Sequence, residues 1–155
     1  MAVVAVAGVA LVACSSSSKT STSSPTTAAG AGATTTTTAA ATVAVATNAQ
    51  FGSILTDPAS GKTLYTRDTD PAGASSCTGG CASTWPPLVM AAGGSGPQAP
   101  NGVSGALTTA ARPDDATKLQ VLLNGKALYA YAGDSAAGDT KGDGVGGIWH
   151  VAKAS

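Results

Sequence analysis

The pattern of apolar and polar positions divides this chain of 155 residues into three parts. Residues 1–13 form an almost unbroken apolar run, and residues 15–48 consist mostly of Ser, Thr, Ala and Gly. From about residue 49 onward, short runs of β-branched and aromatic side chains alternate with turns rich in Gly, Asp and Pro. Because this alternation is typical of strands, the sequence predicts a mainly β domain over residues 49–155, preceded by a disordered linker over residues 15–48.

Each half of the domain contains a predicted hairpin. In the second half, residues 118–123 and 126–131 flank Asn124-Gly125, which is the favoured pair for a type I′ turn because both positions need positive φ. In the first half, residues 53–56 and 62–66 flank a longer turn. We therefore expect two antiparallel strand pairs.

Three other segments have patterns that are less regular. Residues 147–152 are expected to form a closing strand. Residues 106–111 are the best candidate for a short helix, which Pro113 would stop. Residues 42–46 are rich in β-branched side chains, so they fit either the first strand of the domain or the end of the linker.

An internal repeat links the two halves. The sequence GKTLY at residues 61–65 recurs as GKALY at residues 125–129, and the register then holds without a gap. In this register Tyr65 coincides with Tyr129, Asp70 with Asp134, and Trp85 with Trp149. We interpret the domain as two tandem hairpin-based repeats, about residues 51–90 and about 117–153, that form one small β-sheet or sandwich-like domain.

Composition narrows the classes of partner and activity. Charged residues are only 10% of the chain and the formal net charge is zero. Nucleic acids and anionic surfaces attract an excess of positive charge, so this balance argues against both. His150 is the only histidine, so a Ser-His-Asp arrangement would depend on it. Because His150 lies beside Trp149 in a predicted strand, we expect it to be packed or exposed rather than catalytic.

The N-terminal apolar run has the length of an export signal and is shorter than the about 20 residues that a membrane-spanning helix needs. Residues 11–14, Leu-Val-Ala-Cys, resemble the bacterial lipobox. The resemblance implies a lipoprotein signal peptide over residues 1–14, cleavage before Cys14, and a lipid with palmitate-type acyl chains on the Cys14 sulfur. Two or more acyl chains give stable anchoring, so we expect attachment to the extracytoplasmic face of the cell membrane. The alternative is a buried Cys14 in a short N-terminal helix.

The residues after the matched tyrosines carry a family motif. Tyr129, Tyr131 and Asp134 fit the pattern Y-x-[FWY]-x-x-D, whereas the first copy keeps the Tyr and Asp but has Arg67 at the aromatic position. With the lipobox and the Gly-Val-Gly-Gly-Ile-Trp-His ending, this segment resembles the bacterial secreted-repeat lipoproteins over about residues 51–151. The resemblance implies a protein of unassigned function, to which no enzyme chemistry and no cofactor carry over.

Cys77 and Cys81 are separated by three residues in the first repeat. Outside the cytoplasm such a pair is normally oxidised, and closing this loop stabilises a fold by about 2 kcal/mol on the chain-entropy model. We expect a structural disulfide. The alternatives are a redox-active or copper-handling pair, and two free thiols.

Three aspartates lie close together in the second repeat, namely Asp134, Asp139 and Asp143. The segment from Asp139 partly imitates a calcium-binding loop, but Lys141 and His150 stand where that loop needs an oxygen ligand and a bidentate Glu. We expect these carboxylates to accept hydrogen bonds from turn N–H groups, with calcium as the alternative. No metal site is predicted.

The large aromatic side chains are expected to be the core of the two repeats, and a ligand pocket between the repeats is the alternative. Asp70 and Asp134 each follow a tyrosine strand, so they are expected to accept N–H bonds within that turn. For function, we expect a monomeric, lipid-anchored envelope lipoprotein that acts as a binding or structural module, without catalytic residues and with a cell-wall or envelope partner. The alternative is a redox or metal-handling lipoprotein that uses Cys77 and Cys81.

Overall fold

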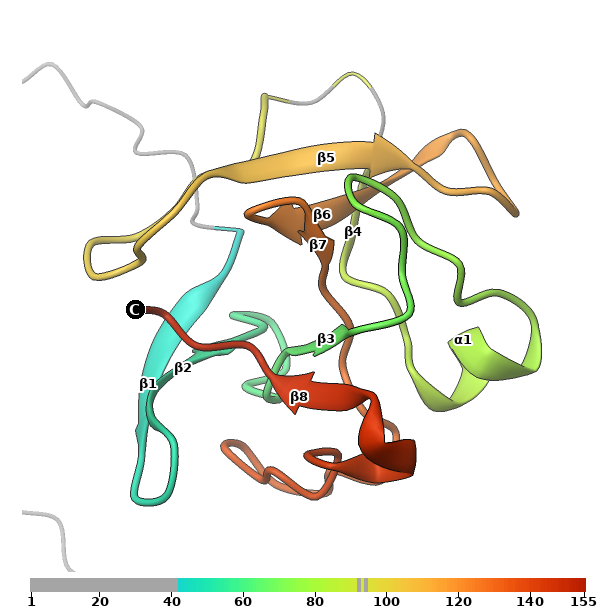
Figure 1. Cartoon of the computed structure of the whole chain (residues 1–155). Helices are drawn as coiled ribbons and strands as arrows, with labels where there is room; N and C mark the ends of the chain where they lie inside the picture. The colour runs from blue at the N-terminus through green and yellow to red at the C-terminus, as the bar shows by residue number, and fades with distance from the viewer. Residues whose placement is uncertain (1–41, 92, 94) are drawn as a thin grey trace, which may run out of the picture. The chain divides into compact units, whose positions relative to one another are not determined.

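The structure is a computed structural model, and it describes residues 42–91, 93 and 95–155 (Figure 1). The predicted signal peptide, Cys14 and the linker as far as residue 41 lie outside the described residues. In the part that is described, eight short strands are accompanied by one α-helix and one 3₁₀ helix. The prediction of a mainly β domain is therefore confirmed.

The first hairpin joins β1 (Ala44–Asn48) to β2 (Gly52–Thr56) in antiparallel register. Residues 42–46 fitted either the first strand or the end of the linker, and β1 includes residues 44–46. The first-strand alternative is therefore correct. Val43, immediately before β1, is fully buried. This anchor places the start of the domain before residue 49, which corrects the predicted end of the linker at residue 48.

The longer turn predicted in the first half connects β2 to β3 (Tyr65–Arg67). The Asp57 N–H donates to the Lys62 carbonyl at 2.9 Å, and the Leu64 N–H donates to the Leu55 carbonyl at 2.9 Å. The two segments therefore pair as predicted, although the regular strand begins only at Tyr65.

The second half begins with β5 (Leu107–Ala111), which pairs along its whole length with β6 (Lys118–Leu123). The short helix expected at residues 106–111 was wrong. A helix of six residues leaves most of its backbone groups without an intrahelical partner, whereas pairing with β6 supplies partners across five positions. The β-branched Thr108 and Thr109 also suit a strand.

The second hairpin joins β6 to β7 (Lys126–Ala127). Asn124 and Gly125 have φ values of 50° and 77°, as a type I′ turn requires. β7 is shorter than the predicted strand over residues 126–131, because the chain leaves β6 and forms bridges from Tyr129 to Tyr65 and Pro87.

The remaining elements are α1 (Gly80–Thr84), β4 (Val89–Ala91), the 3₁₀ helix η1 (Val145–Gly147) and β8 (Trp149–Val151). β4, β6 and β5 form one sheet with β7 on β6, while β1 pairs with β2 and β3 pairs with β8. In Figure 1, β3 and β8 cross the middle of the domain. The closing strand is confirmed at β8. α1 was not predicted, because five residues are too few to show a helical period.

The register of the strands shows where each repeat begins. Ala46 of β1 pairs with Ile54 of β2, and Ala110 of β5 pairs with Gln120 of β6. Ala110 follows Ala46 by 64 residues, the offset that relates the tyrosines, whereas Gln120 follows Ile54 by 66 residues. β5 is thus the counterpart of β1. The repeats therefore start at β1 and β5, earlier than the predicted starts near residues 51 and 117.

Backbone hydrogen bonds between the repeats are reciprocal. The Ala152 N–H donates to the Leu64 carbonyl at 2.8 Å, and the Leu88 N–H donates to the Leu128 carbonyl at 2.9 Å. At the centre, Tyr65 and Tyr129 exchange both of their N–H···O bonds, at 2.7 and 3.0 Å. The two repeats are therefore related by a pseudo-two-fold axis that passes between these tyrosines.

The core has an aromatic part and an aliphatic part. The aliphatic part consists of buried side chains from both repeats, namely Val43, Leu55, Leu64, Val121, Leu123, Leu128, Ala152 and Ala154. The aromatic part surrounds the pseudo-two-fold axis and contains the tyrosines and tryptophans of the repeat motif. The motif thus lies inside the domain, where the two repeats meet.

Candidate functional site

Tyr65 of the first repeat reaches a carboxylate of the second repeat. Its side chain is fully buried, and its hydroxyl donates a hydrogen bond of 2.7 Å to Oδ2 of Asp134. Asp134 is 1% exposed, and its Oδ1 accepts the Lys141 N–H at 3.0 Å. Both carboxylate oxygens are therefore hydrogen-bonded inside the protein.

Tyr129 forms the equivalent pair with Asp70, related to the first pair by the pseudo-two-fold axis. The buried Tyr129 hydroxyl hydrogen-bonds to Oδ2 of Asp70, and it lies 2.7 Å from the Ser75 hydroxyl. Oδ1 of Asp70 accepts the Ser76 N–H at 3.0 Å and the Ser76 hydroxyl at 2.6 Å. Each aspartate accepts a backbone N–H as predicted, but no sequence pattern indicates its second partner, the tyrosine of the other repeat.

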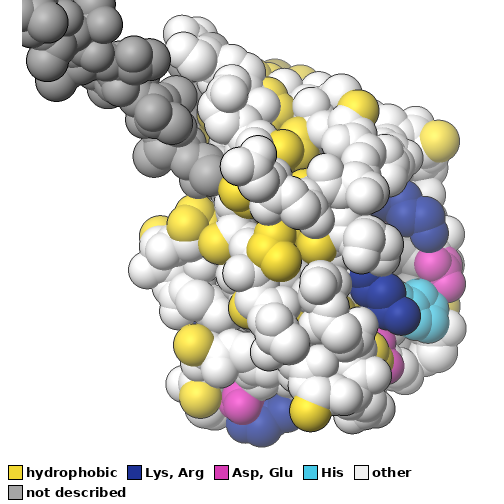
Figure 2. All heavy atoms as spheres, turned by 90° about the vertical axis from the view of Figure 1, so that its left-hand side faces the viewer, with side chains coloured by type: hydrophobic (Ala, Val, Ile, Leu, Met, Phe, Trp, Pro, Cys, Tyr) yellow, Lys and Arg dark blue, Asp and Glu magenta, His cyan; other side chains and the backbone are white. Residues whose placement is uncertain are grey.

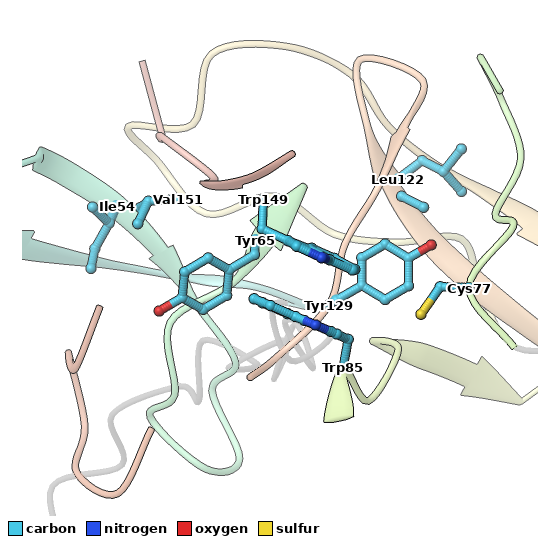
Figure 3. Packing of buried hydrophobic residues seen from close by; sticks show 9 residues of the cluster. Ile54, Tyr65, Cys77, Trp85, Leu122, Tyr129, Trp149 and Val151 are labelled. Atoms are coloured by element: carbon cyan, nitrogen blue, oxygen red, sulfur yellow. The ribbon is translucent and has the colours of Figure 1, made fainter. Parts of the chain in front are cut away.

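The two tryptophans stack on each other between these tyrosines (Figure 3). The ring centroids of Trp85 and Trp149 are 3.7 Å apart and the planes differ by 5°. Tyr65 meets Trp85 edge-on at 5.4 Å, and Tyr129 meets Trp149 edge-on at 5.1 Å. Edge-to-face and stacked contacts each add to the stabilisation that comes from burial.

Arg67 takes the place of the aromatic residue that the first copy of the motif lacks. Tyr131 covers Trp85 at a centroid distance of 4.4 Å, and the Arg67 guanidinium lies 5.6 Å from the Trp149 ring centroid. A guanidinium is planar and stacks on aromatic faces, so it can replace a ring here. Arg67 also lies 3.6 Å from Asp70, which gives the first repeat an ion pair.

Burial sets the protonation of these pairs. Removal from water, reinforced by the hydrogen bond to Asp134, raises the pKa of Tyr65 far above its ordinary value. Removal from water, reinforced by Asp70, raises the pKa of Tyr129 in the same way. Burial also raises the pKa of Asp134. Both phenols therefore remain protonated and act as hydrogen-bond donors.

The other two aspartates of the candidate calcium loop hold turns. Oδ2 of Asp139 accepts the N–H groups of Ser135 and Ala136 at 2.9 and 3.1 Å, and Lys141 lies 2.8 Å away. The Lys141 ammonium is the main cause that lowers the pKa of Asp139 to about 2. Asp143 accepts the Val151 N–H at 3.0 Å. In the part of the chain that is described, no three His, Cys, Asp or Glu side chains are grouped as metal ligands.

His150 is exposed on β8, one of the two expected placements. Its Nε2 lies 2.9 Å from Oδ2 of Asp68, and the Lys126 ammonium lies 3.4 Å from the other oxygen of that carboxylate. Figure 2 shows the histidine beside basic and acidic side chains on the surface. The three side chains form a solvent-exposed polar cluster.

Cys77 and Cys81 form a disulfide, with their Cα atoms 5.3 Å apart. Cys77 is fully buried within the aromatic part of the core. Arg112, also buried, donates to the Cys77 carbonyl at 3.1 Å and to the Gln120 side chain at 2.7 Å. Sequence reasoning missed Arg112, because nothing in its local pattern marks an arginine that will be buried.

The interface between the repeats is filled by side chains, and no pocket is found among the residues the structure describes. Within the same residues, none of the helices has the length and apolar character needed to cross a membrane.

A family model described as a secreted repeat of unknown function matches the chain twice, at residues 45–89 and 110–153. The two matches cover more than half of the chain, and the chain belongs to this family of secreted repeats. The first match spans β1 to β3, α1 and the start of β4, and the second runs from β5 through β8. Nothing matches among the curated proteins or among the solved structures.

The match confirms the predicted family and the presence of two repeats. A secreted repeat works outside the cytoplasm, so the domain is an extracytoplasmic module.

Proposed function

We propose that this protein is a lipid-anchored lipoprotein of the cell envelope whose two-repeat domain acts as a binding or structural module. The lipobox at residues 11–14 supports an anchor on Cys14 at the extracytoplasmic face of the membrane. The Ser/Thr/Ala-rich segment that follows supports a tether, because such a composition cannot bury enough apolar surface to fold. The partner is then a component of the cell wall or envelope, and the protein is a monomer.

One observation carries the proposal of a non-enzymatic module. The polar groups of the motif, Tyr65 with Asp134 and Tyr129 with Asp70, are hydrogen-bonded to each other inside the domain. Side chains committed to the interior in this way favour a role in holding the repeats together. In this proposal, exposed residues of the domain bind the partner, and no residue is assigned a catalytic role.

The disulfide also supports a binding or structural module. Cys77 is buried and its carbonyl is bound by the buried Arg112, which favours a structural role over the redox or metal-handling alternative. In this proposal the bond fixes the loop that carries Ser75 and Ser76 toward the Tyr129–Asp70 pair.

The anchor is tested by replacing Cys14. In a bacterial host that processes lipoproteins, the unaltered chain should fractionate with membranes and Cys14→Ser should not. The matched control is the double variant Cys77→Ser/Cys81→Ser, which removes the other cysteines and should stay in the membrane fraction. Recovery of Cys14→Ser in washed membranes would contradict the proposal.

A further inference from the structure

All three tyrosines and both tryptophans of the chain lie in one continuous network of ring contacts. The contacts run from Tyr131 to Trp85 at 4.4 Å, from Trp85 to Trp149 at 3.7 Å, from Trp85 to Tyr65 at 5.4 Å and from Trp149 to Tyr129 at 5.1 Å. Tyrosine and tryptophan are the side chains that lose a single electron most readily among those that pack as rings. Rings in van der Waals contact exchange electrons efficiently, so the network connects the partly buried Tyr131 to the two fully buried tyrosines.

The two buried tyrosines have what a tyrosine needs in order to be oxidised. A phenol that loses an electron becomes a strong acid and must release its proton to a base already within hydrogen-bond reach. Tyr65 donates to Oδ2 of Asp134 at 2.7 Å, and Tyr129 donates to Oδ2 of Asp70. Both carboxylate side chains are almost fully buried. Bulk water therefore does not compete with them as an acceptor of the phenol proton.

We propose that the aromatic cluster is a one-electron relay that takes oxidising equivalents from the surface and holds them as neutral radicals on Tyr65 and Tyr129. The oxidant is a one-electron acceptor outside the cytoplasm, of the class of peroxyl radicals or oxidised metal complexes. This activity goes beyond the role of a binding or structural module and does not depend on lipid attachment.

The steps balance in electrons and protons. The oxidant takes one electron from the Trp85 ring, directly or through Tyr131, and is thereby reduced by one electron. The Trp85 radical cation then takes one electron from Tyr65, whose O–H bond breaks as the proton moves to Asp134. The products are neutral Trp85, a neutral Tyr65 phenoxyl radical and a protonated Asp134. Tyr129, Trp149 and Asp70 perform the same steps in the other repeat.

A purely structural core would not require these carboxylates. Replacing a buried pair of polar groups by apolar side chains of similar volume is often neutral or stabilising. Both repeats nevertheless place a carboxylate on the buried phenol, on opposite sides of the tryptophan stack. Burial raises the pKa of Asp134, which makes this carboxylate a better proton acceptor.

The test uses the purified full chain and photogenerated ruthenium(III) tris-bipyridine as the one-electron oxidant. Transient absorption and electron paramagnetic resonance distinguish phenoxyl from indole radicals. In the unaltered chain we expect an indole radical that converts to phenoxyl, at a rate that falls in D₂O and does not depend on buffer concentration. An indole radical that decays without forming phenoxyl, or a rate set by the buffer, would overturn the relay.

Variants assign the proton acceptor. In the background Tyr129→Phe/Tyr131→Phe, only Tyr65 remains, and adding Asp134→Asn should abolish the phenoxyl signal and leave the indole radical. The matched control is Asp68→Asn in the same background, which removes an exposed carboxylate and should leave the signal unchanged.

The equivalent variants in the other repeat keep the test valid if Asp134→Asn does not fold. In the background Tyr65→Phe/Tyr131→Phe, only Tyr129 remains, and adding Asp70→Asn should abolish its signal. Folding of each variant is checked by circular dichroism. An equal phenoxyl yield with and without the aspartate, in either set, would refute the proposal.

Discussion

The hydroxyl of Tyr65 donates a hydrogen bond of 2.7 Å to the carboxylate of Asp134, 69 positions further along the chain. The pseudo-symmetric hydroxyl of Tyr129 hydrogen-bonds to Asp70. Each repeat thus supplies the donor that the other repeat's buried acceptor needs. A buried carboxylate without its donor is costly, so neither repeat is complete by itself.

Removing one hydroxyl should measure this dependence. We expect Tyr65→Phe and Tyr129→Phe each to lower the free energy of unfolding by about 1–3 kcal/mol, because each leaves a buried carboxylate oxygen without its donor. Tyr131→Phe is the matched control, since its partly exposed ring keeps the stack, and it should change stability by less than about 0.5 kcal/mol. Urea unfolding followed by tryptophan fluorescence gives these values. Equal effects at all three positions would contradict the cross-repeat pairing.

Separated repeats should fold only together. We expect the fragments 42–95 and 96–155 to be unfolded alone, because each exposes half of the tryptophan stack and lacks a partner for its tyrosine. An equimolar mixture should recover the near-ultraviolet circular dichroism of the uncut domain. A fragment that shows a cooperative transition by itself would argue that the repeats are independent.

Arg67 offers a test of the replaced aromatic position. We expect Arg67→Ala to cost about 1–2 kcal/mol, since it loses both the cation–π contact with Trp149 and the ion pair with Asp70. Arg67→Tyr restores the family motif and keeps a ring on Trp149, so it should cost less, about 0.5 kcal/mol. Thermal and urea unfolding would show the ranking. If Arg67→Tyr is the more damaging change, the guanidinium is more than a substitute ring.

Loss of the disulfide should weaken the domain without unfolding it. On the chain-entropy model, Cys77→Ser/Cys81→Ser should lower the free energy of unfolding by about 2 kcal/mol, because the closed loop is short. A thiol titration of the unaltered native domain should find neither Cys77 nor Cys81 reactive. Two reactive thiols in freshly purified protein would contradict the bond.

Asp134 should make stability depend on pH. Burial raises its pKa above the ordinary value of 3.8, so the folded state binds this proton more tightly than the unfolded state. The contribution of Asp134 to the free energy of unfolding is therefore largest below pH 3.8. It falls as the pH rises toward the folded-state pKa, and it is constant above that pKa.

The matched comparison is unfolding of the unaltered chain and of Asp134→Asn over about pH 3–8. The difference in free energy of unfolding between them isolates Asp134, because every other titrating group is present in both. We expect the unaltered chain to lose stability relative to the variant as the pH rises. A difference that does not vary with pH would show that the pKa of Asp134 is unshifted by folding.

The β class, the two hairpins, the repeat and the cysteine pair could all be predicted from the amino-acid sequence. Each of these features depends on a few neighbouring residues or on a constant spacing along the chain. Asn124-Gly125 specifies its turn because both residues adopt positive φ. The spacing from tyrosine to tryptophan is the same in both copies. The disulfide could be predicted for the same reason, because Cys77 and Cys81 are close in sequence.

How the two copies complete each other became visible only in the folded domain. Local turn chemistry predicted that Asp70 and Asp134 accept backbone N–H bonds, but their tyrosine partners come from the opposite repeat across the pseudo-two-fold axis. The short window around residues 106–111 predicts a helix wrongly, because it does not contain β6, the neighbouring strand that fixes the conformation of β5. These outcomes depend on contacts between distant segments, and such contacts exist only once the two repeats have packed together.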